Sequence, residues 1–167
     1  MLRMLLLLTV MQVDLLSPHG EKAVVLLFVR SDCPISNRYA PALQRLYHRY
    51  SSRGVEFRLV YPEPGLTASA LERHCKEYGL AIPALLDADH KYVDRAQVRV
   101  TPEAAVFVKG RLVYRGRIDD RFVDIGKSRP EATRHDLDEV LTAVATGKSI
   151  QRRQTKAVGC AIENLRR

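Results

Sequence analysis

The sequence predicts a three-layer α/β/α protein with a mixed central sheet and, towards its C-terminal end, a hairpin followed by a helix. The apolar run Ala23–Val29 is typical of a central strand that is buried on both faces. Helical and extended patterns then alternate, which favours parallel strands covered by helices. Two extended segments follow one another after residue 100 and indicate a hairpin. The 167 residues are enough for one domain with its own core.

The elements after the first strand begin with a long helix, predicted over Pro34–Arg53. Pro41 lies inside this helix and should kink it, and Gly54 should end it. Its apolar stripe consists of Leu43, Leu46, Tyr47 and Tyr50. Val55–Tyr61 is the next predicted strand, stopped by the prolines that follow it.

A second helix is expected to begin at Ser69-Ala70-Leu71-Glu72, which has the form of a capping box. Its apolar stripe would hold Leu71, Cys75 and Tyr78, so we interpret Cys75 as a buried structural thiol. Ala81–Leu86 is a short strand candidate, and His90–Gln97 is a short helix candidate.

The hairpin is predicted from Ala104–Val108 and Leu112–Ile118, joined by a turn at Lys109-Gly110. A polar segment follows as far as Pro130. Thr133-Arg134-His135-Asp136 resembles a helix cap, and the helix after it should end at Gly147. The apolar face of this helix consists of Leu137, Val140, Leu141 and Val144.

Residues 1–147 are expected to form the domain, and residues 148–167 a basic tail that carries Cys160. Residues 1–11 read either as a signal-like segment or as a first strand, so an exported and a cytoplasmic protein remain equally open. This segment is too short to span a bilayer, and we expect no stable membrane insertion. The net charge of +8 favours anionic partners, but no phosphate-binding loop or aromatic-basic pattern indicates nucleic acid.

Cys33 is the residue that indicates chemistry, because it stands where the first strand passes into the first helix. A thiol at a helix N-terminus loses its proton more easily, and the thiolate is the nucleophile of disulfide exchange. Asp32 disfavours the thiolate, whereas Arg30 and Arg38 offset that effect. Ser36 stands where a C-x-x-C pair would have its second cysteine. Three cysteines are too few for a disulfide framework, and no two have zinc-ligand spacing.

The order of elements, Cys33-Pro34-Ile35-Ser36 at a strand-helix junction and Val100-Thr101-Pro102 before the hairpin together resemble the thioredoxin superfamily. The resemblance covers about Val13 to Gly147. It implies a thioredoxin-like fold in which Pro102 is a cis-proline packed beside the active-site sulfur, and in which Thr101 and Pro102 shape the substrate groove.

A narrower resemblance is to peroxiredoxin-like redoxins of the AhpC/TSA type with a single active-site cysteine, in the C-x-x-S form. It is carried by the run from Ser31 to Pro41, by Thr101-Pro102-Glu103-Ala104, by the segment from Tyr114 to Arg121 and by Gly159-Cys160. It implies a thiol-disulfide oxidoreductase without a cofactor. In this reading Cys33 is the nucleophile, Ser36 cannot resolve the mixed disulfide, and Cys160 is the candidate resolving thiol. The redox partner would be a disulfide-bearing protein or a small thiol.

Three other functions remain open at this stage. A peroxidase would need a P-x-x-x-[TS]-x-x-C frame, but Leu26 and Arg30 occupy its first two fixed positions; Arg115 and Arg117 are the candidate arginines. A Sco-like copper protein would join Cys33 and Cys160 with one of His74, His90 or His135. A non-catalytic binding module would use the groove beside Pro102 for an extended peptide or a partner domain.

Overall fold

The structure is a computed structural model that describes residues 15–16, 20–151 and 153–163. The segment 1–11, predicted to be signal-like or a first strand, lies outside the described residues. A five-stranded sheet forms the centre, in the order β3-β2-β1-β5-β6. Its strands are β1 (Ala23–Phe28), β2 (Val55–Tyr61), β3 (Ala84–Leu86), β5 (Glu103–Val108) and β6 (Arg111–Gly116). The first three are parallel, whereas β5 runs antiparallel to β1 and β6, which confirms a mixed sheet.

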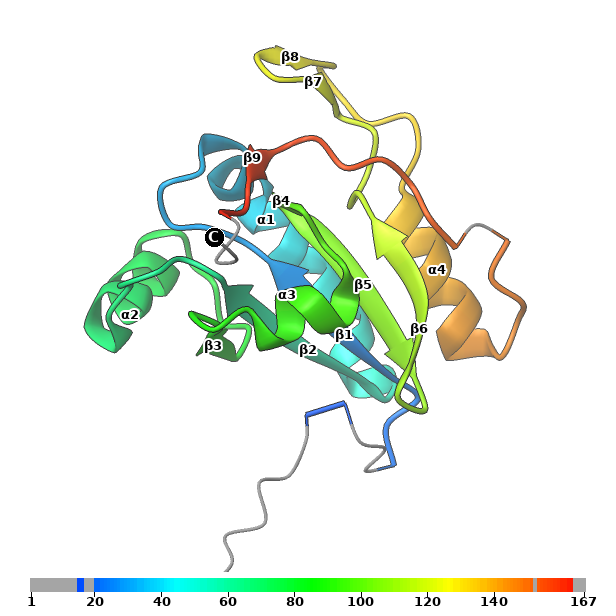
Figure 1. Cartoon of the computed structure of the whole chain (residues 1–167). Helices are drawn as coiled ribbons and strands as arrows, with labels where there is room; N and C mark the ends of the chain where they lie inside the picture. The colour runs from blue at the N-terminus through cyan, green and yellow to red at the C-terminus, as the bar shows by residue number, and fades with distance from the viewer. Residues whose placement is uncertain (1–14, 17–19, 152, 164–167) are drawn as a thin grey trace, which may run out of the picture.

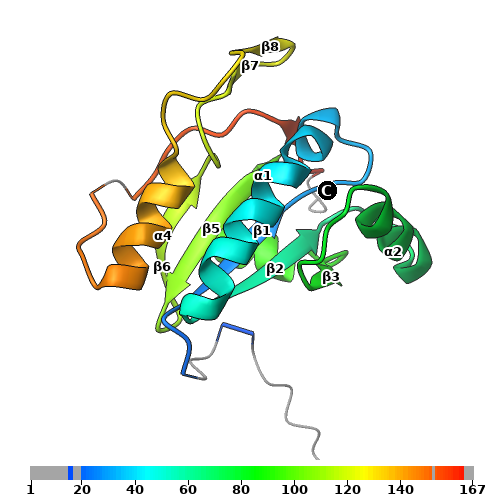
Figure 2. The same ribbon diagram turned by 180° about the vertical axis from the view of Figure 1, so that it is seen from behind.

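Helices cover both faces of this sheet, as Figures 1 and 2 show from opposite sides. They are α1 (Pro34–Tyr50), α2 (Ala68–Glu77), α3 (Lys91–Ala96) and α4 (Asp136–Thr146). Val25 and Leu27 of β1 belong to the apolar cluster that includes α1 and α4, and Val24 and Leu26 to the cluster that includes α3. Because β1 contributes side chains to both clusters, all six of its residues are buried. The predicted central strand and three-layer fold are thus confirmed.

Two predicted helix caps are wrong. Thr67 rather than Ser69 caps α2, because the Thr67 hydroxyl accepts the Ala70 amide hydrogen at 3.2 Å. At α4 the N-cap is His135, whose side chain makes no capping bond. The Thr133 hydroxyl instead donates to the Asp120 carboxylate at 2.7 Å, so it fixes the loop before the helix.

Several boundaries also differ from the sequence pattern. Residues Ser51–Arg53 tighten into a 3-10 turn after α1. The third strand is shorter than predicted, because the Ala81 amide bonds the Gln44 side chain instead of a neighbouring strand. The polar segment before Pro130 contains a small hairpin, β7 (Phe122–Asp124) and β8 (Lys127–Ser128). This hairpin stands out from the domain at the end where α1 begins (Figures 1 and 2).

The described part of the C-terminal tail lies against the domain. Residues 153–155 follow β6: the Arg115 amide donates to the Arg153 carbonyl, and the Thr155 amide donates to the Arg115 carbonyl, at 3.0 and 3.1 Å. A Cβ at Gly116 would collide with Thr155, so the close approach requires a glycine there. The tail then forms β9 (Cys160–Ala161), which pairs with β4 (Val100–Thr101). No helix in the described residues has the length and apolar character needed to cross a bilayer.

Candidate functional site

Cys33 lies between the end of β1 and the start of α1, as the sequence predicts. It is the N-cap residue of α1, with extended backbone angles, and Pro34 occupies the first turn, where its missing amide hydrogen costs nothing. The Cys33 side chain is 0% exposed. Its Sγ lies 3.2 Å from the Thr101 carbonyl oxygen, which would accept a hydrogen bond from a reduced Cys33 thiol.

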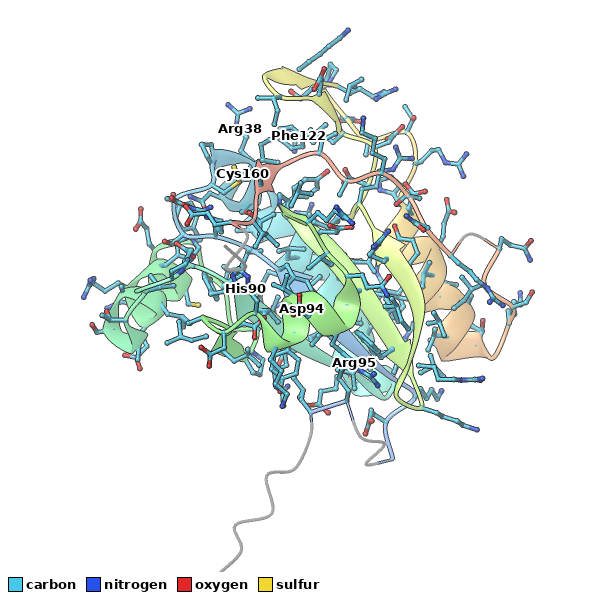
Figure 3. The ribbon with its side chains drawn as sticks, in the orientation of Figure 1. Arg38, His90, Asp94, Arg95, Phe122 and Cys160 are labelled. Atoms are coloured by element: carbon cyan, nitrogen blue, oxygen red, sulfur yellow. A yellow bond between two sulfur atoms is a disulfide. The ribbon has the colours of Figure 1, made fainter. Side chains whose placement is uncertain are left out.

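A disulfide joins Cys33 to Cys160 across 127 residues of sequence, with a Cα–Cα distance of 6.1 Å. This distance lies within the usual range for disulfides. Figure 3 shows Cys160 on β9, above the end of the domain where α1 begins. In contrast to Cys33, Cys160 is partly exposed. Sequence reasoning left the pairing of these two cysteines open, and the structure brings them together.

The tail reaches Cys33 by adding a strand to β4. Thr101 pairs with Cys160 in antiparallel register, and the Ile162 amide donates to the Arg99 carbonyl at 2.9 Å. The Thr101–Pro102 bond is cis, as the resemblance implied. A Cβ at Gly159 would collide with the Thr101 carbonyl group, so the tail can approach this strand because residue 159 has no side chain.

Ser36 lies one turn into α1 and is buried, with 3% of its surface exposed. Its hydroxyl oxygen accepts the Arg30 amide hydrogen at 3.4 Å. Ser36 therefore ties the start of the helix to the end of β1, and the second sulfur of the site comes from the tail.

Arg30 connects the loop before Cys33 with the tail. Its guanidinium pairs with the Asp32 carboxylate at 2.9 Å and donates to the Ala161 carbonyl at 3.2 Å. The hydrogen bonds that Arg30 donates to Asp32 raise the pKa of Arg30. Arg30 thus offsets the charge of Asp32, as predicted, whereas Arg38 is exposed and points outward (Figure 3).

Sequence reasoning missed the groups that hold the loop before Cys33. The buried Glu63 carboxylate accepts the Ser31 amide at 2.9 Å and the Ser31 hydroxyl. The Asn37 side chain donates to the Ser31 carbonyl at 3.1 Å, so its oxygen is the acceptor for His74 Nε2 at 2.9 Å. Glu63 stands between two prolines, and its sequence surroundings carried no signal for this role.

Burial and these contacts favour the neutral form of the His74 imidazole. Its Nδ1 lies 2.8 Å from the Tyr61 hydroxyl, which donates to it when Nε2 carries the hydrogen. Burial lowers the pKa of His74. Cys75 is partly buried beside the Tyr61 hydroxyl, at 3.5 Å, and is the free cysteine of the described residues. The sequence predicts a buried structural thiol at Cys75; the residue packs against the main apolar cluster but is only partly buried.

The arginines considered for a peroxide site are engaged elsewhere. Arg115 donates to the Gln97 carbonyl and lies 3.8 Å from the Glu103 carboxylate, and Arg117 bonds Asp136 at 2.6 Å. Glu103 also accepts the Arg99 and Val100 amides, so it supports β4.

The histidines predicted as possible copper ligands do not lie together around the disulfide. His90 contacts the Pro62 carbonyl at 2.9 Å, and His74 belongs to the Asn37 network. Within the described ranges, no group of three or more His, Cys, Asp or Glu side chains has the arrangement of a metal site.

Comparison with known proteins places this chain in a family. The sequence pattern of the AhpC/TSA family matches residues 9–116. The thiol-disulfide oxidoreductase ResA of Halalkalibacterium halodurans is 34% identical over 82 residues, which are 48% of this chain and 45% of ResA. The chain thus spans about half the length of the curated relative that it matches.

Solved structures share the fold. A hypothetical protein from Sinorhizobium meliloti aligns with a TM-score of 0.72 at 24% identity, over 85% of this chain and 79% of its own. An uncharacterized conserved protein from Geobacillus kaustophilus aligns with a TM-score of 0.74 at 24% identity, over 87% and 78%. StoA from Bacillus subtilis aligns with a TM-score of 0.53 at 18% identity, over 75% and 84%. These matches confirm a thioredoxin-like α/β fold with a mixed central sheet.

Proposed function

The chain belongs to the AhpC/TSA family, and we propose that it is a thiol-disulfide oxidoreductase in which Cys33 is the nucleophile and Cys160 the resolving thiol. One observation carries this proposal: the tail brings Cys160 into a disulfide with Cys33, which lies at a helix N-terminus and beside a cis-proline. The relative named as a thiol-disulfide oxidoreductase adds support.

The reaction follows from the positions of the two sulfurs. The Cys33 thiolate attacks one sulfur of a disulfide R–S–S–R′, forms Cys33–S–S–R and releases R′–S⁻. The Cys160 thiolate then attacks Cys33 Sγ, which releases R–S⁻ and forms the Cys33–Cys160 disulfide. Two electrons pass from the protein to the substrate, and a reducing thiol must later restore the dithiol. Thr101 and Pro102 would form the wall against which the substrate sulfur lies.

Peroxidase chemistry has less support from the geometry. Arg115 and Arg117, the arginines considered for a peroxide site, bind carboxylates and a carbonyl group on β5, α4 and the end of α3. Arg30 occupies the position where the peroxidase frame has Thr or Ser, and it binds Asp32 and the tail.

A single-turnover experiment tests the proposed function. The fully reduced protein is mixed with a protein disulfide such as insulin, and the products are separated by mass. The wild type should release reduced substrate and acquire the internal disulfide, whereas Cys160→Ser should stop as a mixed disulfide through Cys33. Cys75→Ala should behave as the wild type. Release of reduced substrate by Cys33→Ser at the wild-type rate would contradict the proposal, and retained partner binding without exchange would favour the binding-module alternative.

A further inference from the structure

The two cysteine residues of the Cys33–Cys160 disulfide differ in exposure to solvent. Cys33 is 0% exposed, between the end of β1, the first turn of α1 and the Thr101 carbonyl. Cys160 is partly exposed, on a strand of two residues that lies along the surface of β4. A thiolate must approach the sulfur that it attacks from the side opposite the leaving sulfur, and which sulfur is attacked depends on access. Cys160 is the more exposed residue of the pair and so the more accessible target, whereas Cys33 is 0% exposed.

The two sulfurs also differ as leaving groups. Cys33 is the N-cap of a helix of 17 residues, where the amide hydrogens of the first turn and the helix dipole stabilise a thiolate. Cys160 lies in the two-residue strand β9 rather than at a helix N-terminus. The Thr101 carbonyl oxygen disfavours the thiolate form of Cys33, although it can accept a hydrogen bond from the protonated thiol. Because a better-stabilised thiolate leaves faster, Cys33 is favoured as the leaving sulfur.

We propose that the reducing partner enters at Cys160, so that Cys160 is the exchange cysteine of the oxidised protein. This inference rests on the proposed function, in which the disulfide is formed and reduced in turn. The partner is a dithiol reductant with a thiolate on an accessible surface. Its thiolate bonds Cys160 Sγ, and the Cys33–Cys160 bond breaks to release the Cys33 thiolate. The second thiol of the partner then attacks the partner's own sulfur in this mixed disulfide, which releases Cys160 as a thiolate and leaves the partner oxidised.

This order assigns different sulfurs to the two half-reactions. Cys33 contacts the disulfide substrate, and Cys160 contacts the reductant. When Cys160 carries the partner, the covalent link to Cys33 is broken, and the pairing of β9 with β4 and the Arg30 contact with Ala161 are what still hold the tail. Cys33 is then a thiolate while Cys160 is bonded to the partner.

Mapping the first mixed disulfide tests this order. Oxidised Cys75→Ala protein, checked by mass for the internal disulfide, is mixed with excess reduced glutathione, and samples are quenched in acid at increasing times. Free thiols are then blocked with N-ethylmaleimide, and the peptides are identified by mass. Glutathione should appear on Cys160 and the block on Cys33, with at least a tenfold preference at the earliest times. The wild type is mapped in parallel, so the result does not depend on how well the variant folds.

Glutathione found mainly on Cys33, or equally on both cysteines from the start, would overturn the proposal. Absence of the internal disulfide in air-oxidised protein would overturn it as well. This mapping needs no protein substrate, so its outcome is distinct from that of the insulin experiment. If glutathione maps to Cys33 while insulin is still reduced, the proposed function stands and the order of attack fails. If glutathione maps to Cys160 but insulin is not reduced, the order of attack stands and the proposed function fails.

Discussion

Replacing Gly159 by alanine is expected to weaken the Cys33–Cys160 disulfide while the domain stays folded. A Cβ at this position would overlap the Thr101 carbonyl group and lie 3.1 Å from the Pro102 nitrogen. These are backbone atoms of a paired strand and its cis-proline, so they cannot move aside as a flexible side chain would. The tail must therefore retreat from β4.

The size of the effect follows from the contacts that this retreat breaks. The Ile162 amide leaves the Arg99 carbonyl, Arg30 leaves the Ala161 carbonyl, and Thr101 leaves the Cys160 carbonyl. Each hydrogen bond contributes about 0.5–1.5 kcal/mol net. A total of about 2–3 kcal/mol would lower the dithiol-to-disulfide equilibrium constant about 30- to 150-fold. For a two-electron couple, the reduction potential would become about 40–60 mV more oxidising.

The assay is equilibration of the protein in buffers of reduced and oxidised dithiothreitol, followed by alkylation and intact mass. Ala161→Ser is the matched control, because it changes an exposed residue of the same strand and should leave the potential unchanged. A Gly159→Ala protein with the wild-type potential would refute the reasoning that close docking of the tail on β4 holds the disulfide together.

Three further predictions concern the surroundings of the site. Thr155→Val removes the oxygen that accepts the Arg117 amide and contacts the Tyr114 hydroxyl, so urea unfolding should show a loss of about 1–2 kcal/mol in the free energy of unfolding. An unchanged urea midpoint would contradict the inference that Thr155 anchors the tail. Hydrogen bonds from Thr133 hold the pKa of Asp120 below its usual range, so Asp120→Asn should cost about 1.5–3 kcal/mol at neutral pH. That contribution is present above the unfolded pKa of about 4 and is lost as the pH falls, so the stabilities of the two proteins should converge in acid. Burial raises the pKa of Glu103, so the contribution of this residue to folding stability is present below its unfolded pKa and is lost as the pH rises. The stability of Glu103→Gln should therefore increase relative to that of the wild type from pH 4 to pH 7. A stability difference that stays constant over this pH range would exclude this prediction.

The central architecture could be predicted because it rests on local patterns. The continuous apolar run at Ala23–Val29 required a strand covered on both faces, and β1 is buried throughout. The junction at Cys33 followed from the change of this run into a helical pattern. Helix starts were less predictable. Ser69 and Thr133 have the spacing of a capping box, but Thr67 caps α2 through the Ala70 amide, and the Thr133 hydroxyl bonds Asp120 instead.

The second sulfur of the site was harder to derive, because no local pattern fixes a contact across 127 residues. Two glycines were the available signal. Gly159 precedes Cys160, and Gly116 ends β6, but a sequence does not show which backbone will pass over a glycine. The groups around Ser31 were missed for the same reason, since Glu63 and Asn37 come from different elements and meet only in the folded protein.

The position of the second cysteine in the tail changes what controls the disulfide. In a C-x-x-C pair one helical turn holds both sulfurs, whereas here the tail must dock before Cys160 reaches Cys33. The Thr155 anchor on β6 shortens the free segment that ends at Cys160 from 13 residues (148–160) to five (156–160). Loop-closure entropy makes this shortening worth about 0.8 kcal/mol, or about a fourfold gain in effective concentration. The equilibrium of the site therefore depends on backbone contacts at Gly116 and Gly159, which means that substitutions outside the two cysteines can tune the redox reaction without touching either sulfur.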